Sequence, residues 1–355
     1  MEPNVNSKQL FISVIIPVHN SAEYLGKCLD ALAASSYKSY EIIVVDDAST
    51  DNSFEIGRKK GVVVHELPRK SGAAAARNYG AKKAKGDIFL FVDSDVVVRR
   101  DTVAQVAHDF MKNPDIAAVF GSYDDSPADS GFISQFRNLL HHYIHQVSLK
   151  EAMTFWTGCG AIKREVFYQV REFDESWYAM EDVEIGFRMW KSGYRIVLDK
   201  ELQVKHLKHW GLYSLVRTDV FYRAVPWSRL IFESGFLPSD LNLQTSHRIS
   251  GVLVGFLFLV LALLNLSALG FFNIVANGVL LIAVLSLVFT LIILNRKVYG
   301  FFLRKRGIKF MLLSIPLHFF YYFYSGTTFV ACWTIHRFPS FQSGLKKLGF
   351  GLLKR

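Results

Sequence analysis

Two long apolar stretches without any charged residue constrain this chain more than any other feature. Residues 249–272 and 274–294 are each long enough to cross a hydrocarbon layer of ~30 Å, which takes ~20 apolar residues in a helix. A third apolar stretch, residues 310–335, contains Pro316 and Gly326, which permit a broken or re-entrant segment. On length, we predict an integral membrane protein with three spans, of which the first two form a tight hairpin.

Basic residues beside the apolar stretches predict how the chain is oriented. The loop at residues 295–309 is rich in Lys and Arg, so the positive-inside rule places it in the cytosol, together with the N-terminal part of the chain. A single crossing by residues 310–335 would put the basic tail, residues 336–355, outside, so the side of the tail stays open. The net charge of +10 matches this pattern and attraction to anionic headgroups. No nucleic-acid motif accompanies it, so we expect no nucleic-acid partner.

The N-terminal part alternates short β-branched runs with amphipathic segments. Continuous apolar runs of this kind predict a parallel sheet that is covered by helices on both faces. The three cysteines are far apart and in no CxxC spacing, which indicates neither a disulfide framework nor a zinc site. The polar start, residues 1–9, does not resemble a signal peptide. The predicted strands are residues 11–17, 41–46, 62–65 and 88–92.

Acidic residues follow two of these predicted strands. Asp46 and Asp47 end the second, and Asp93 and Asp95 end the fourth. Ligands bind beyond the carboxyl ends of strands in open parallel sheets. Asp93 and Asp95 offer hard oxygen ligands to Mg²⁺ or Mn²⁺, and such an ion neutralises a diphosphate leaving group. Asp46 and Asp47 fit either ligand binding or a helix N-cap or turn.

Five segments in this order resemble glycosyltransferase family 2, with its GT-A nucleotide-sugar-binding fold. The resemblance covers roughly residues 10 to 230. The segments are SVIIPVHN (13–20), VVDDASTD (44–51), GAAAARN (72–78), Gly86-Asp87 and Asp93-Ser94-Asp95. The implied fold class is α/β, with a GT-A catalytic domain followed by a helical transmembrane region. The implied divisions are residues 1–205 (GT-A domain), 206–248 (membrane-interface helices completing the site), 249–335 (transmembrane region) and 336–355 (basic amphipathic tail).

The resemblance also implies residues that bind the donor. Pro17 and Asn20 would belong to the loop around the nucleotide, and Asp47 or Asp46 would hold the uracil or equivalent base. Arg77 would lie near the base or the phosphates. In the "DxD" motif, Asp93 would face the ribose and the metal ion, and Asp95 would ligate the metal ion.

Glu181 and Asp182 resemble the "ED" motif of the family, in which the aspartate is the general base. A hydroxyl is a poor nucleophile, so a carboxylate within hydrogen-bond reach must accept its proton during attack. Attack opposite the leaving diphosphate inverts the anomeric centre. A helix start, with both acids complementing the dipole, is the other reading, and the two are compatible. Relatives that load a polyprenyl phosphate typically lack this base, so the pair favours a hydroxyl acceptor.

Histidines supply further metal candidates. His206 resembles the histidine that completes the metal shell in several GT-A enzymes, with His209 as its rival and a structural role as the alternative. His141, His142 and His145 have a spacing that could bind metal on a helix, but no Glu follows in the zincin pattern. For these three we favour a polar helix face next to the membrane.

Four residues are predicted on the acceptor side. Trp156 and Gly158 fit the acceptor loop of the family, where a glycine permits close approach of a sugar. Arg223 would touch the diphosphate, and Trp227 would touch an acceptor sugar or anchor the chain at the membrane interface.

Together these features predict an inverting, metal-dependent glycosyltransferase in the bacterial inner membrane, with a cytosolic catalytic domain. It would move sugar from a nucleotide-sugar, a UDP-sugar, to a hydroxyl of a membrane lipid or lipid-linked glycan. The alternatives are a polyprenyl-phosphate sugar synthase, a short-chain polysaccharide synthase and a non-enzymatic nucleotide-binding scaffold. Oligomeric state is left open.

Overall fold

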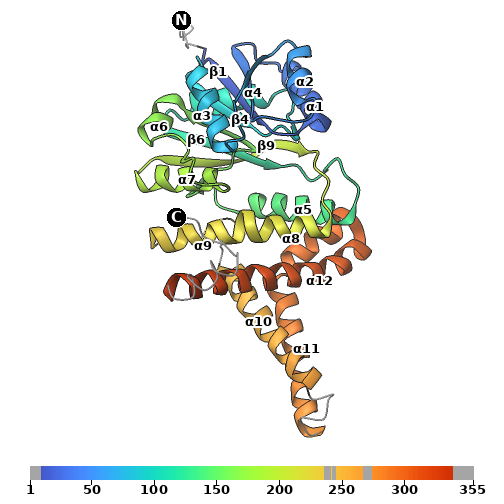
Figure 1. The fold of residues 1–355 in the computed structure, drawn as a ribbon. Helices are drawn as coiled ribbons and strands as arrows, with labels where there is room; N and C mark the ends of the chain where they lie inside the picture. The colour runs from blue at the N-terminus through green and yellow to red at the C-terminus, as the bar shows by residue number, and fades with distance from the viewer. Residues whose placement is uncertain (1–8, 236–240, 242–244, 267–273, 339–355) are drawn as a thin grey trace, which may run out of the picture. The chain divides into compact units, whose positions relative to one another are not determined.

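The computed structural model describes residues 9–235, 241, 245–266 and 274–338 (Figure 1). The chain divides into two compact units, Met1–Trp210 and Gly211–Arg355, which we call the N-terminal and the C-terminal unit.

The N-terminal unit is built on one mixed sheet. Its strand order is β3-β2-β1-β4-β8-β6-β9-β5, and β7 pairs with β9. The strands β1 to β4 are parallel, as the sequence predicts, whereas β8 runs antiparallel to both β4 and β6. The strands are β1 (Ile12–Val18), β2 (Tyr40–Asp46), β3 (Val63–Glu66), β4 (Ile88–Val92), β5 (Val96–Val97), β6 (Ile116–Tyr123), β7 (Glu151–Ala152), β8 (Cys159–Lys163) and β9 (Arg195–His206).

Helices cover both faces of this sheet because successive side chains of each strand point to opposite faces. Ile12 and Val14 of β1 join the core that α1 and α4 cover, whereas Ile15 meets Gly80 of α3 on the other face. The predicted fold class is confirmed. The helices of this unit are α1 (Ala22–Ala33), α2 (Ser53–Lys59), α3 (Ala73–Lys83), α4 (Thr102–Lys112), α5 (Phe132–Val147), α6 (Arg164–Gln169) and α7 (Glu181–Lys191).

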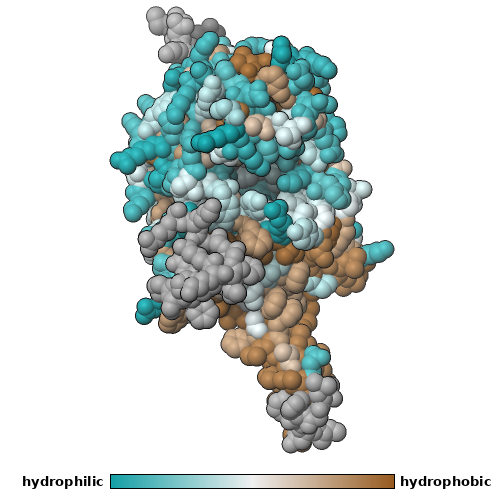
Figure 2. All heavy atoms as spheres, viewed as in Figure 1, coloured by the Kyte–Doolittle hydropathy of each residue, from teal (hydrophilic) through white to brown (hydrophobic). Residues whose placement is uncertain are grey.

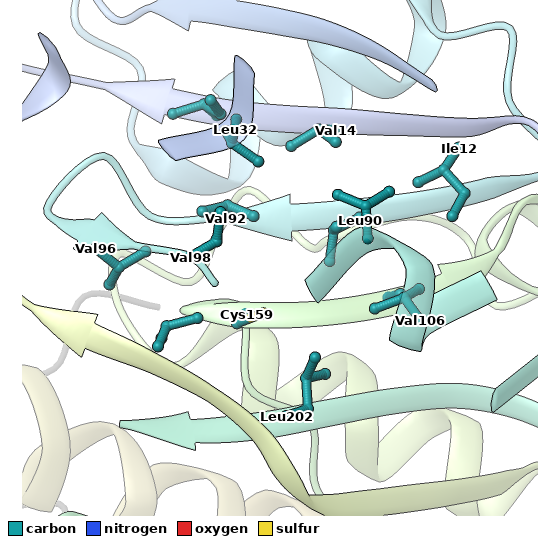
Figure 3. Packing of buried hydrophobic residues seen from close by; sticks show 14 of the residues in the cluster. Ile12, Val14, Leu32, Leu90, Val92, Val96, Val98, Val106, Cys159 and Leu202 are labelled. Carbon is teal, nitrogen blue, oxygen red and sulfur yellow. The ribbon is translucent and has the colours of Figure 1, made fainter. Parts of the chain in front are cut away.

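The apolar core extends to the carboxyl end of β4, where the acidic motif begins. Val92, the last residue of β4, is fully buried and pairs with Cys159 of β8. Val96 and Leu202 belong to the same core cluster, so both sides of the acidic turn are anchored in the core (Figure 3). The short acidic turn between Val92 and Val96 is thus held at both ends.

The C-terminal unit consists of helices. α12 is interrupted at Gly307, whose φ of 80° lies in the left-handed region that glycine adopts readily. α12 contacts α8, α9 and α10, and Figure 1 shows it running beside α8 and α9 across the hairpin of α10 and α11. The helices are α8 (Leu212–Asp219), the π-helical turn Val220–Ala224, α9 (Val225–Ser234), α10 (Thr245–Leu266), α11 (Ile274–Leu294) and α12 (Arg296–Arg337).

Two described helices are long and apolar enough to cross a membrane, by length and composition: Thr245–Leu266 and Val275–Leu294. Their apolar side chains are mostly exposed, as at Val275 (71%) and Phe289 (67%), so they do not form the core of this unit. They match the first two predicted spans, except that residues 267–272 lie outside the described residues. Residues 310–335 belong to α12, which does not meet the same test; their crossing stays a prediction.

Candidate active site

The two carboxylates of the DxD motif point to different partners. Asp93 accepts a hydrogen bond from Nη2 of Arg77 at 2.8 Å, whereas Oδ2 of Asp95 lies 3.6 Å from Nε2 of His206. The turn between them is fixed by Ser94, whose hydroxyl donates to Ser21 at 2.8 Å. Burial raises the pKa of Asp93, and the Arg77 guanidinium offsets part of this rise.

Asp95 and His206, two residues of types that commonly ligate metals, lie side by side. Val96 pairs with His206 across β5 and β9, and the Leu207 amide donates to the Asp95 carbonyl at 2.8 Å, so the two segments are locked together. His206 is buried, and its ring stacks on Tyr123 at 4.2 Å. Burial acts to raise the pKa of Asp95, but the neighbouring His206 outweighs it, and the pKa is lowered.

This donor set fits a divalent ion that takes its other ligands from water and phosphate oxygens. A carboxylate oxygen and an imidazole nitrogen both suit Mn²⁺, and the carboxylate suits Mg²⁺. Within the described parts of the chain, no group of three His, Cys, Asp or Glu side chains is arranged as a metal site. Asp93, the third predicted ligand, is turned to Arg77. His209, the rival of His206, is exposed and bonds to Asp129 at 2.8 Å.

Arg77 joins the two acidic motifs of the predicted site. Its buried guanidinium bonds to Asp93 through Nη2 and to Glu181 through Nη1. Burial acts to lower the pKa of Arg77, but Glu181 and Asp93 outweigh it, and the pKa is raised. Its Nε is buried and has no hydrogen-bond partner among the described residues. The sequence predicts Arg77 near the base or phosphates; the structure adds this bridge.

Asp182 is held in position by Thr157, a residue with no predicted role. Oδ2 of Asp182 accepts from both the amide and the hydroxyl of Thr157 at 3.2 Å, while Oδ1 accepts from the Val183 amide at 2.8 Å. Helix α7 begins here, after Met180, whose φ of 65° is unusual for a residue with a side chain. Burial and the adjacent Glu181 raise the pKa of Asp182 to about 6. A carboxylate with this pKa is suited to act as a general base near neutral pH.

Close packing places α7 against the loop that carries Thr157. A side chain at Gly186 would overlap the backbone of Thr154 and Phe155, so only glycine lets the helix come this near. The hydrogen bonds between Asp182 and Thr157 therefore depend on the close contact at Gly186, one helical turn further along α7.

The other acidic strand end is occupied by hydrogen bonds from the main chain. Asp47 accepts from the amides of Ser71 at 2.6 Å and Gly72 at 2.8 Å, just before α3. Asp46 accepts from the amide and hydroxyl of Ser49. Both aspartates are buried. The bonds from Ser49 to Asp46 are those of a turn, and the role of either aspartate in holding a base stays a prediction.

The predicted nucleotide loop is tied to the loop after β2. Oδ1 of Asn20 accepts from the Thr50 amide at 2.7 Å, and the Asn20 amide donates to Ser49 at 2.9 Å. Pro17 lies within β1, opposite Val45 of β2. The two loops thus form one connected edge, at which nucleotide binding by Pro17 and Asn20 stays a prediction.

Aromatic rings surround Trp156, the first predicted acceptor residue. Its indole lies 4.9 Å from the Tyr123 ring, 5.1 Å from His141 and 5.8 Å from His145, centroid to centroid. The space that a side chain at Gly158 would take is filled by this indole, so the glycine makes room for Trp156.

The predicted polar face of three histidines is wrong. His142 and His145 are buried in the N-terminal unit and bond to the carbonyls of Tyr123 and Gly121 at 2.8 and 3.1 Å. His141 packs against His145 with ring centroids 4.0 Å apart. Burial lowers the pKa of His145 to about 4 and that of His141 well below its ordinary value, so these two rings are neutral near pH 7 and pack beside Trp156.

Arg223 and Trp227 belong to the C-terminal unit. Nη1 of Arg223 lies 3.4 Å from Asp219, whose other oxygen accepts from the Tyr324 hydroxyl at 2.7 Å. Trp227 is half-buried on α9. Their predicted contacts with diphosphate and acceptor stay predictions.

Three residues near the site carry no recognisable sequence signal. Thr157 holds Asp182, and Tyr123 stacks on His206. Lys208, two residues after His206, is exposed, and its Nζ lies 4.6 Å from the centroid of the Trp210 ring. Lys208 adds a positive charge that helps to lower the pKa of Asp95.

The sequence motifs and the fold of the N-terminal unit point to one protein family. Residues 13–171 match the model of glycosyl transferase family 2. This match assigns residues 13–171 to glycosyltransferase family 2, as the five sequence segments predict.

Curated relatives are also glycosyltransferases. Glycosyltransferase GlyG of Streptococcus pneumoniae is 29% identical over 187 residues, which cover 46% of this chain and 62% of GlyG. The poly(ribitol-phosphate) beta-glucosyltransferase of Bacillus spizizenii is 45% identical over 92 residues, or 24% of this chain and 14% of that protein. The chain thus spans less than two thirds of the length of these curated relatives.

The fold resembles that of the mannosyltransferase PcManGT from Pyrobaculum calidifontis, solved with GDP-Man and Mn²⁺. The TM-score is 0.52 at 21% identity, covering 64% of this chain and 65% of that one. This likeness confirms the GT-A-like fold.

Proposed function

We propose that this protein is an inverting, metal-dependent glycosyltransferase that moves a sugar from a nucleotide-sugar to a hydroxyl acceptor. The observation that carries this proposal is the bridge made by Arg77. Its guanidinium bonds to Asp93 of the DxD motif and to Glu181, the neighbour of Asp182. The groups for binding a diphosphate and the group for accepting a proton therefore belong to one connected cluster.

In the proposed reaction, each residue has a defined task. Asp95 and His206 would hold the divalent ion, which supplies positive charge to the departing diphosphate. Asp182 accepts the proton of the acceptor hydroxyl while the new bond forms from that oxygen to the anomeric carbon. The bond from the anomeric carbon to the diphosphate oxygen breaks on the opposite face, and the nucleoside diphosphate leaves with that electron pair.

The arrangement around Asp182 supports its role as base. With a pKa of about 6, its carboxylate is ionised at neutral pH yet more basic than an ordinary aspartate. The two bonds from Thr157 fix one oxygen and hold the carboxylate in one orientation. An acceptor that was already ionised, such as a phosphate, would need no such base.

The proposed donor and acceptor follow from the similar proteins. We propose that the donor is a UDP-sugar and that the metal ion is Mn²⁺ or Mg²⁺. PcManGT was solved with GDP-Man and Mn²⁺, which supports a nucleotide-sugar donor and a divalent ion but does not support uracil as the nucleobase. A hydroxyl acceptor agrees with the poly(ribitol-phosphate) relative, since a ribitol polymer presents hydroxyls.

We further propose that the acceptor is a membrane lipid or lipid-linked glycan at the cytosolic face of a bacterial inner membrane. The exposed apolar surfaces of α10 and α11 support attachment to a bilayer. Attachment raises the effective concentration of an acceptor in the same bilayer.

The test is turnover by the full chain in lipid nanodiscs. A panel of nucleotide-sugars is supplied with Mn²⁺ or Mg²⁺, with and without a membrane lipid extract, and released nucleoside diphosphate is measured. We expect one donor class to be turned over only with metal, and faster with extract. No turnover of any donor would overturn the proposal in favour of a nucleotide-binding scaffold.

The variant Asp182→Asn separates the enzyme alternatives. It should lower transfer to a hydroxyl by roughly a hundredfold or more, whereas a polyprenyl-phosphate sugar synthase would keep nearly all its activity. Product mass distinguishes a single transfer from a short-chain polysaccharide synthase.

A further inference from the structure

The C-terminal part of the chain is strongly cationic in sequence. From Leu241 to Arg355 the sequence contains no Asp or Glu, whereas Lys and Arg occur twelve times. Within the described part of this unit, Asp219 and Glu233 already bond to Arg223 and Arg229. Surfaces of soluble domains usually intersperse both signs of charge. This stretch therefore has a single sign of side-chain charge.

The cations concentrate where α12 is interrupted. Arg304, Lys305, Arg306 and Lys309 surround Gly307, and all four are exposed. We call these four residues the basic break. One helical segment of α12 ends before Gly307 and another begins after it. The four side chains therefore do not lie along one face of a single helix.

Apolar side chains are exposed at the same place. Leu303 is 44% exposed, Ile308 64% and Leu312 54%. Aliphatic and cationic side chains exposed together are typical of the boundary between hydrocarbon and headgroups, where cations reach outward from apolar stems. On a surface facing only water, the apolar members of this group would have no partner.

The position of α12 within its unit fits that boundary. It contacts α8, α9 and α10, and Figure 1 shows it crossing the hairpin of α10 and α11 rather than continuing it. Figure 2 shows apolar residues covering the hairpin. A hairpin that enters a bilayer would leave a crossing helix near the level of the headgroups.

We propose that the basic break binds the headgroups of anionic phospholipids, with Leu303, Ile308 and Leu312 among the acyl chains. α12 then lies in the membrane interface instead of forming a third span. The inference rests on the proposed membrane attachment and does not depend on sugar transfer.

The test measures hydrogen exchange of residues 303–313 in the full chain. The protein is reconstituted into phosphatidylcholine nanodiscs with or without phosphatidylglycerol. Exchange should be roughly tenfold or more slower in the anionic discs at low salt, since each cation near an anionic surface gives about a fivefold preference. High salt should remove the difference because it screens exposed charges.

Two variants with equal loss of charge make the test specific. Changing the four cations of the basic break to Gln should abolish the difference between the two kinds of disc. A matched control with four exposed lysines of the N-terminal unit changed to Gln should keep it. The control positions are Lys59, Lys70, Lys85 and Lys112.

Three results would overturn the inference. Equal exchange in both kinds of disc excludes a preference for anionic lipid. Strong protection in both kinds that ignores salt indicates a segment buried in the bilayer, as a third span would be. Recovery of the chain outside the discs overturns the membrane attachment as well, and donor turnover by that soluble chain shows whether the proposed transfer survives.

Discussion

Two pairs of aspartates end strands of the same sheet, yet they have different partners. Asp46 and Asp47 accept hydrogen bonds from neutral donors, namely three backbone amides and one hydroxyl. Asp93 and Asp95 face ionisable side chains, Arg77 and His206.

This difference teaches how to distinguish a structural acid from a functional one. The donors at Asp46 and Asp47 are main-chain amides and a hydroxyl, and buried amides must be satisfied in any folded chain. Burying a guanidinium and an imidazole beside Asp93 and Asp95 costs free energy, which a functional role would explain. The second pair is therefore the one we expect to control turnover.

The strongest test of this contrast is Asp95→Asn. The amide is a poorer metal ligand, and a metal ion contributes several kcal/mol to leaving-group stabilisation. We expect metal-dependent release of nucleoside diphosphate to fall on the order of a thousandfold. The Tm without metal should stay close to that of the native chain. If Asp47→Asn lost a similar amount of turnover at unchanged Tm, the distinction between the two pairs of aspartates would be wrong.

Asp182→Asn should have the next largest effect on turnover. A positioned general base contributes roughly a hundredfold or more to the rate. The side-chain oxygen of the introduced asparagine can still accept from Thr157, so the affinity for nucleotide should change little. Calorimetry with nucleoside diphosphate and Mn²⁺ checks this. Thr157→Val, which keeps the amide but loses the hydroxyl, should give a smaller loss. Full activity in Asp182→Asn would assign the proton to another group.

The sequence predicts one part of this site better than the other. Apolar runs ending in acids locate Asp47 and Asp95 at strand ends, because strand period and burial are local properties. The bridge from Arg77 to Glu181 depends on how α3 and α7 pack against the sheet, and no local pattern contains that information. The antiparallel β8 was missed for the same reason, since strand direction follows from long-range pairing.

Asp47→Asn should lower stability rather than chemistry. The amide nitrogen would face the Ser71 or Gly72 amide, donor against donor, where a carboxylate now accepts from both. We expect a loss of about 1 to 2 kcal/mol in the free energy of unfolding. Thermal unfolding measures it, with Asp30→Asn on the exposed surface as the control. A normal Tm with weakened nucleotide binding would instead favour the base-holding role.

The pH profile should show the raised pKa of Asp182. The base acts in its ionised form, so kcat should fall as pH drops below about 6 and level off above it. Well below that value the fall is about tenfold per pH unit. Measuring kcat at saturating donor and metal isolates the base from donor binding. A profile that stays flat down to pH 5 would mean that Asp182 does not carry the proton.

Replacing Lys208, which lies near Asp95, should have the smallest effect of these substitutions. It distinguishes a lysine that binds the diphosphate from one that only supports the loop. The exposed Lys208 ammonium follows His206 and lies over the Trp210 ring, close enough to influence Asp95. An exposed charge of this kind contributes about 1 kcal/mol, or roughly fivefold, to binding a diphosphate. Lys208→Gln should therefore weaken binding of nucleoside diphosphate about fivefold, while nucleoside monophosphate binding changes less and Lys208→Arg restores the preference. Equal weakening of both nucleotides would show that Lys208 supports the loop and not the diphosphate.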